Sequence, residues 1–174
     1  MPTFLFYIGF MFEKILLLFL SGIGGLYDVK SRRIPNWLTL GVPVLLLVFY
    51  ALQFKISGVL NCIIGFSVGV LLLIVPYLLG GMGAGDVKLL GVIGAVIGWK
   101  DVISVFVYSA LAGFFLALLW IIITPGHLKY LITTGKIFPV LDKKEKMPYG
   151  LAILAGTIVY VLIGSYNFFG LSSH

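Results

Sequence analysis

Long apolar runs with very few charged residues dominate this sequence and restrict what it can fold into. A membrane-spanning helix needs about 20 apolar residues, and several runs approach that length. They cover residues 4–27 (interrupted by Glu13 and Lys14), about 35 or 37–52, 59–79, 81–99, 102–123 and about 148–163. Only helices and closed barrels satisfy backbone groups in lipid, and runs without alternation exclude a barrel. The sequence therefore predicts an all-α integral membrane protein with six transmembrane helices in a single domain, 1–174.

The composition supports a membrane protein. Hydrophobic residues make up 61% of the 174 residues and charged residues only 10%. A soluble chain of this size could not hide so much apolar surface, which excludes a soluble enzyme, a disordered tail and a secreted disulfide scaffold. Cys62 is the single cysteine, so neither an intrachain disulfide nor a zinc site of several cysteines is possible. His127 and His174 are isolated, and we expect no metal and no cofactor.

Lysine and arginine are distributed unevenly among the loops. The loops after the first, third and fifth runs hold Lys30, Arg32, Arg33, Lys88, Lys129, Lys136, Lys143, Lys144 and Lys146. The intervening loops hold only Lys55 and Lys100. Because basic loops stay in the cytoplasm, we expect these three loops inside and both termini outside, in a multi-pass protein of the cytoplasmic (inner) membrane. The net charge of +6 then reflects topology, not nucleic-acid binding.

The segment 124–147 is the one long connection between the predicted helices. It mixes apolar residues with lysines, and two interpretations remain open. It could lie on the inner leaflet and bind anionic lipid headgroups, or its lysines could serve only as a topological anchor. Membrane lipid is an expected partner in either case.

Four of the six acids have ordinary explanations. Asp142 and Glu145 lie among lysines in the cytoplasmic segment, and Asp101 follows a lysine in an outer loop, so we expect all three to be solvated. Glu13 precedes a lysine in the first helix, where a paired or snorkelling side chain is favoured over a functional one.

Asp28 and Asp86 are different, because the topology brings them together. Asp28 follows Tyr27 at the end of the first predicted helix, and Asp86 opens the fourth. Two spans lie between them, which places both acids at the same face of the membrane. The helix from Asp86 to Trp99 is about 20 Å long in a hydrocarbon core of about 30 Å. Asp86 is then expected inside the inner boundary, where an acid usually lines a cavity or faces a partner.

Two carboxyls in such a pocket could act together on a peptide bond. At about 4 Å and an effective dielectric constant of about 20, two carboxylates repel each other by roughly 4 kcal/mol. One acid then keeps its proton while the other ionises. An aspartic protease needs this arrangement, since the ionised acid takes a proton from water and the neutral one polarises the scissile carbonyl. The pair titrates as a unit, so the two roles stay unassigned.

Several neighbours of these acids are candidate motif residues. Glycines at 80, 81, 83 and 85 allow unusual backbone conformations and a close approach to a substrate strand, although a simple hinge is the alternative. Lys88 follows Asp86 as Lys30 follows Asp28, and we favour headgroup anchoring for both lysines. Pro35 is expected to start the second helix. Asn36 could cap that turn or contact substrate, and capping or turn formation is favoured. The small residues at 21–25 could allow close helix contact near the site.

Three motifs together resemble those of the type IV prepilin peptidases. Residues 83–88 resemble the GxGD signature, and Asp28 followed by Arg-Arg-Ile-Pro-Asn at 32–36 resembles the first motif of that family. Met-Pro-Tyr-Gly at 147–150 resembles the start of the last helix of these enzymes. The similarity covers nearly the whole chain, in matching order.

The resemblance implies an intramembrane aspartic endopeptidase that cuts the basic leader from prepilins or pilin-like proteins at the cytoplasmic membrane boundary. Carried over by motif, the catalytic pair is Asp28 and Asp86, and Gly83 and Gly85 shape the second motif. Bifunctional members carry an N-terminal insert with paired cysteines and also methylate the product. This sequence shows no such insert, and it resembles the short, peptidase-only members that serve tight-adherence (Flp-type) pili.

Two other functions would also explain acids within a membrane. A small proton-coupled transporter could use both acids as a relay, but this leaves the glycine run and the Ile-Pro-Asn unexplained. A non-catalytic membrane subunit could use them as assembly contacts, and it would tolerate Asp→Asn changes. The oligomeric state is not indicated by the sequence.

Overall fold

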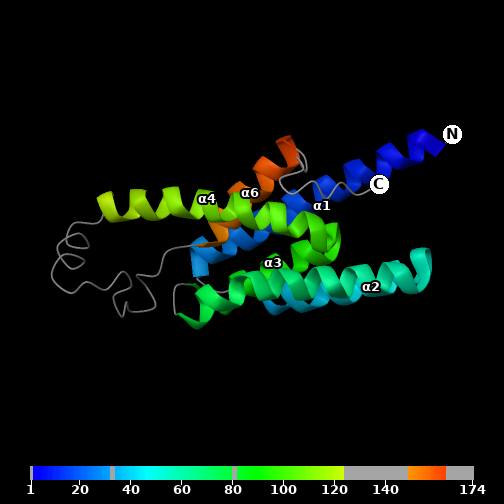
Figure 1. Ribbon diagram of the computed structural model, residues 1–174, viewed down its shortest axis with the longest axis horizontal. Coiled ribbons are helices and arrows are strands. Elements are labelled where there is room, and N and C mark those ends of the chain that lie inside the picture. The colour runs from blue at the N-terminus through cyan, green and yellow to red at the C-terminus, as the bar shows by residue number, and fades with distance from the viewer. Residues whose placement is uncertain (1, 32–33, 80–81, 124–148, 164–174) are drawn as a thin grey trace.

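All the elements that the structure, a computed structural model, describes are helical (Figure 1). It describes residues 2–31, 34–79, 82–123 and 149–163. The elements are α1 (Pro2–Ser31), the π-helical turn η1 (Trp37–Gly41), α2 (Val42–Leu78), α3 (Ala84–Ile97), α4 (Trp99–Ile123) and α6 (Tyr149–Ile163). The predicted all-α class is confirmed. The basic segment 124–147 and both histidines lie outside the described residues.

Two of the described helices are long and apolar enough to cross a membrane. They are Ile56–Leu78, within α2, and Trp99–Leu119, within α4. Trp37–Gln53 and Tyr149–Ile163 are shorter apolar helices. The predicted number of six spans, and the predicted orientation of the chain, therefore stay predictions.

The chain entering α2 runs in the same direction as α3. A methyl group on Gly85, at the start of α3, would lie 3.0 Å from Cγ1 of Ile34. Sixteen residues further on, as counted from the sequence, the Tyr50 hydroxyl donates a hydrogen bond of 3.0 Å to the carbonyl of Val96, near the end of α3. The first half of α2 thus lies parallel to α3.

The second half of α2 runs in the opposite direction. Asn61 lies against Gly98, just after α3, while Gly69 lies against Leu90 in the middle of α3. The chain therefore reverses between residues 50 and 61, as predicted for two separate spans. The connection expected at 53–58 is a helical turn, because the backbone keeps its helical assignment through the reversal between the apolar helices Trp37–Gln53 and Ile56–Leu78.

Helix α3 is the centre of the bundle. It contacts every other described helix, and nearly all of its residues are buried. Its 14 residues correspond to about 21 Å, which agrees with the short helix expected within 81–99 and is less than the hydrocarbon core of about 30 Å. Because other helices surround α3, it does not need the length of a lipid-facing helix.

Glycines allow α2 and α3 to approach closely. A methyl group on Gly65 would overlap the carbonyl oxygen of Gly94 on the facing helix, and the reverse also holds. Gly98 then separates α3 from α4 with a φ of 84°, a conformation that glycine adopts without steric cost.

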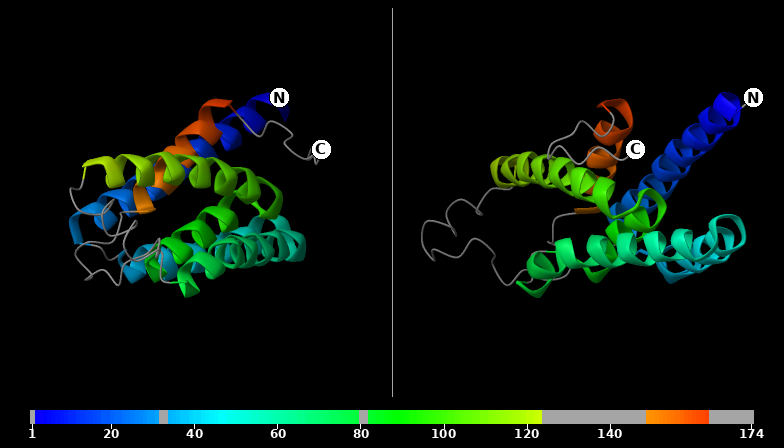
Figure 2. Two further views of the ribbon diagram at one scale, coloured as in Figure 1. Left: turned by 60° about the vertical axis from the view of Figure 1, so that its left-hand side comes forward. Right: turned by 45° about the vertical axis from the view of Figure 1, so that its right-hand side comes forward.

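Helices α1, α4 and α6 lie together on the other side of α3 from α2 (Figure 2). The ammonium of Lys14 donates to the carbonyl of Val161 at 3.1 Å, whereas Gly25 packs against the carbonyl of Gly150. α1 and α6 are therefore antiparallel, and the last turn of α1 meets the first turn of α6.

We predict that Gly65→Ala separates α2 from α3. The added methyl has no room against the Gly94 carbonyl, and overpacking of this kind typically costs about 1–3 kcal/mol. Thermal unfolding of the detergent-solubilised protein measures this loss. Gly41→Ala is the matched control, because a methyl there meets nothing within 4 Å. Equal melting temperatures for the two variants would contradict the close packing.

Candidate active site

Asp28 and Asp86 lie at the same end of the bundle, as the sequence predicts. Asp28 is in the last turn of α1 and Asp86 is in the first turn of α3. Gly24 packs against Leu89, so α1 and α3 are antiparallel where they meet. The two carboxyl groups are near enough to interact electrostatically. Asp28 does not end the helix, however, because α1 continues for three more residues to Ser31.

The carboxyl of Asp86 is held at the start of its own helix. Oδ2 accepts a hydrogen bond of 3.1 Å from the backbone N–H of Gly83, and the N–H of Asp86 donates back to the carbonyl of Gly83 at 3.2 Å. Asp86 is only 3% exposed. Its Oδ1 is buried and has no hydrogen-bond partner among the described residues. A buried polar atom without a partner costs about 1–3 kcal/mol, so this oxygen is poised to bind water or another polar group.

The carboxyl of Asp28 is held by a different helix. Its Oδ2 accepts a hydrogen bond of 2.9 Å from the backbone N–H of Gly150, the second residue of α6. The first N–H groups of a helix have no partner within the helix and attract negative charge. Asp28 is 8% exposed, so this contact is largely shielded from solvent.

Tyr149 is a third polar group at this end. It is the first residue of α6, and it interacts electrostatically with Asp86. Its ring lies on α4, where a methyl on Gly113 would be 2.8 Å from Cε2 of Tyr149. The site is therefore built from the ends of three helices, with α4 supporting the third.

The glycines of the predicted second motif have different roles. Gly83 has φ −85° and ψ 152°, which any residue adopts, so the expectation of an unusual backbone conformation is wrong there. It is exposed, which leaves room beside Asp86. Gly85 does need to be small, because a methyl would lie 3.0 Å from Ile34. Gly80 and Gly81 lie outside the described residues.

The remaining candidates of the first two motifs are not brought to the carboxyls by a described contact. Pro35 precedes η1, and its carbonyl accepts bonds from the N–H groups of Leu38 and Thr39. Asn36 lies within this turn, as expected, and occupies the N-cap position, but it makes no side-chain cap hydrogen bond, so side-chain capping is wrong. Lys88 is half-buried and lies two residues after Asp86, a spacing that does not share a helix face.

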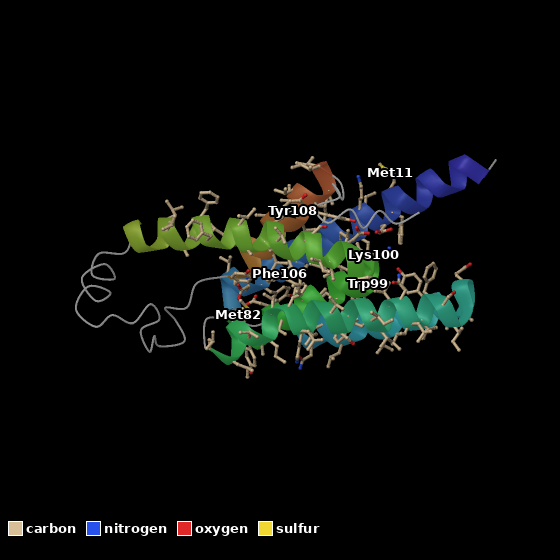
Figure 3. All side chains as sticks on the ribbon, in the orientation of Figure 1. Met11, Met82, Trp99, Lys100, Phe106 and Tyr108 are labelled. Atoms are coloured by element: carbon tan, nitrogen blue, oxygen red, sulfur yellow. The ribbon has the colours of Figure 1, made fainter. Side chains whose placement is uncertain are left out.

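A second polar cluster lies at the opposite end of the bundle. Glu13 interacts electrostatically with Asp101 and Lys14, which agrees with the predicted paired glutamate. Asp101 is half-buried instead of fully solvated. Figure 3 shows this separation, since Trp99 and Lys100 mark the end of the bundle that holds Asp101, whereas Met82, just before α3, marks the end that holds Asp86.

The site suits acid–base chemistry. No group of three or more His, Cys, Asp or Glu side chains occurs among the described residues. Two carboxyls that interact electrostatically can share one proton and exchange it with water. The structure thus brings together Asp28 and Asp86 from the sequence prediction and adds Tyr149 and Gly150.

Two contributors to the site were missed as site residues by sequence reasoning, although the sequence held a signal for each. Tyr149 and Gly150 belong to the Met-Pro-Tyr-Gly motif, but the motif does not show that α6 starts against Asp28. The small residues at 21–25 were expected to allow close helix contact, and this is confirmed, because Gly24 and Gly25 pack directly on α3 and α6.

Comparison with known proteins identifies the family of this chain. The model of the Type IV leader peptidase family matches residues 15–118, which include both aspartates and the glycine motif. That match covers more than half of the chain, and the chain belongs to this family. The resemblance read from the motifs is therefore confirmed.

A characterised relative comes from Bacillus subtilis (strain 168). It is named prepilin leader peptidase/N-methyltransferase, and it is 29% identical over 161 residues, which cover 88% of this chain and 56% of that protein. The chain thus spans little more than half the length of this relative. No solved structure matches the chain significantly.

We predict that a disulfide can join α1 to α6 beside the site. The Cβ position of residue 25 lies 3.5 Å from Cβ of Leu154, within the range of about 3.5–4.5 Å that disulfides require. In a Cys62→Ser background, the pair Gly25→Cys with Leu154→Cys should oxidise readily. Gel mobility after proteolysis between the two helices measures the cross-link.

The control for this cross-link is Gly22→Cys paired with Leu154→Cys. A side chain at residue 22 meets nothing within 4 Å, so this pair should stay reduced under the same conditions. Equal cross-linking of both pairs, or of neither, would show that α1 and α6 do not cross at Gly25.

Proposed function

We propose that this protein is a prepilin leader peptidase, an intramembrane aspartic endopeptidase in which Asp28 and Asp86 are the catalytic pair. The observation that carries the proposal is the placement of these two buried carboxyls at the same end of an apolar helix bundle, where the end of α1 packs on the start of α3. Family membership supports a peptidase, and the name of the Bacillus relative supports a prepilin substrate.

The proposed reaction uses one carboxylate and one carboxylic acid. The ionised member takes a proton from a water molecule, whose oxygen attacks the scissile carbonyl carbon while the neutral member donates a hydrogen bond to the carbonyl oxygen. The tetrahedral intermediate then collapses as the C–N bond breaks, and the departing amine receives a proton from the pair. The buried Oδ1 of Asp86, which has no described partner, is well placed to contact water or substrate.

The proposed substrate is a chain with a basic leader followed by an apolar helix. Such a helix can lie in the bilayer, so its cut site falls at headgroup level, where water is available. The catalytic pair lies at an end of α3, not at its middle, which suits a bond at the rim of the bilayer. Gly83, whose N–H donates to Asp86, is itself exposed.

The proposed setting is the cytoplasmic membrane, with the catalytic end facing the cytoplasm. Many large apolar side chains of α2 and α4 point outward, including Leu45, Leu52, Ile56, Leu71, Phe114 and Phe115. Lipid would cover such surfaces. The basic residues near the catalytic end, Lys30 and Lys88 among them, support a cytoplasmic location by the positive-inside rule. The proposal covers the peptidase step alone.

We predict that Asp28→Asn and Asp86→Asn each slow leader removal by at least about 10²-fold, because each removes a group that holds or accepts a proton in the transition state. The experiment co-expresses each variant with prepilin-like proteins encoded nearby and measures the loss of the leader by mass spectrometry. Membrane insertion is checked in parallel.

Asp101→Asn is the matched control for this experiment. It removes an acid at the opposite end of the bundle and should leave cleavage close to that of the unchanged protein. Full cleavage by either Asn variant at position 28 or 86 would remove that residue from the mechanism. Proton-coupled flux in proteoliposomes without any proteolysis would favour a transporter instead.

A further inference from the structure

The backbone of the first turn of α6 packs directly against the side chain of Asp28. The N–H of Gly150 donates to Oδ2 at 2.9 Å. A methyl group on Gly150 would lie 2.8 Å from Cβ, 3.0 Å from Oδ2 and 3.2 Å from Cγ of Asp28. The place of a side chain at residue 150 is therefore already occupied by the aspartate.

The helix crossing around this contact is equally close. A methyl on Gly25 would lie 3.2 Å from the carbonyl oxygen of Gly150, so the backbone of α6 is held between two points one turn apart on α1. Asp28 touches the N–H side of Gly150 and Gly25 touches its carbonyl side. The same turn of α6 also contacts α4, because the ring of Tyr149 packs on Gly113.

We propose that Gly150 is a positioning residue for the reaction, which sets the orientation of the Asp28 carboxyl through its N–H and through its lack of a side chain. This inference rests on the proposed function, since it assigns a role within the same site. Asp86 is oriented from its own helix by Gly83, whereas Asp28 is oriented by a helix that begins 121 residues later in the sequence. The distance between the two carboxyls therefore depends on where α6 begins.

The proposed positioning role distinguishes Gly150 from other glycines of the bundle, which only allow helices to pack closely or face open space. Gly156, on the same helix, has no room for a methyl because Ser109 of α4 fills the space, yet it lies far from both aspartates along α6. Gly22 faces open space. Gly156→Ala and Gly22→Ala are therefore matched controls, one for disturbed packing of α6 and one for the substitution itself.

The test compares kcat and KM for cleavage of a prepilin by the full-length protein in detergent. Gly150→Ala displaces Asp28, and a misplacement of about 1 Å can cost about 10²-fold in rate. We expect kcat to fall by about that factor with KM nearly unchanged, because the substrate still binds. Gly22→Ala should match the unchanged protein. Gly156→Ala should lower the melting temperature while the folded fraction keeps its kcat.

If Gly150→Ala also lowers the stability of the protein, a thermal unfolding experiment shows whether the added methyl group acts on Asp28. Asp28→Gly removes every atom that the new methyl would meet at the distances given above. If the methyl acts on Asp28, the loss of melting temperature caused by Gly150→Ala is smaller in the Asp28→Gly background. An equal loss in both backgrounds, or an unchanged kcat for Gly150→Ala, overturns the proposal.

The outcomes also distinguish this inference from the proposed function. Cleavage that survives Asp28→Asn removes the catalytic role of Asp28, and the role of Gly150 with it. Cleavage that is lost in Asp28→Asn but normal in Gly150→Ala overturns only the positioning role and leaves the catalytic pair intact.

Discussion

A carboxyl group inside an apolar helix bundle needs hydrogen-bond donors to offset the cost of its burial, and that constraint shapes one end of this molecule. Asp86 takes its donor from the N-terminus of α3 and Asp28 from the N-terminus of α6. Helix N-termini suit this purpose because their first N–H groups have no partner within the helix. The end of α1 and the beginnings of α3 and α6 must therefore coincide, and the rest of the bundle makes this possible.

The central position of α3 follows from a second constraint of the same kind. A short helix with an acid in its first turn could not lie alone in lipid, where its ends would stay unsatisfied. Here α2 packs on α3 twice, once in each direction, and α1, α4 and α6 cover the remaining surface. At Gly65 and Gly94 the backbones of α2 and α3 lie directly against each other, which brings α2 near enough to bury α3.

Much of this arrangement follows from the sequence by simple physics. Apolar runs predict the helices, and the number of runs between Asp28 and Asp86 predicts that both reach the same end. Those arguments use only length and parity. They cannot show that α3 is enclosed, because a buried helix and a lipid-facing helix have equally apolar sequences. Nor can they show the contact between Gly150 and Asp28. That contact depends on how far α6 is shifted along α1, and the two helices are separated by most of the chain.

The central claim is that both carboxyls act on one peptide bond, and a structure of an inactive complex tests it most directly. An experimental structure of the Asp86→Asn protein bound to an uncut prepilin would locate the scissile carbonyl. The account predicts that this carbonyl lies within hydrogen-bond reach, directly or through one water, of both Asp28 and position 86. A scissile bond beside Glu13 and Asp101, or within reach of only one of the two positions, would contradict it.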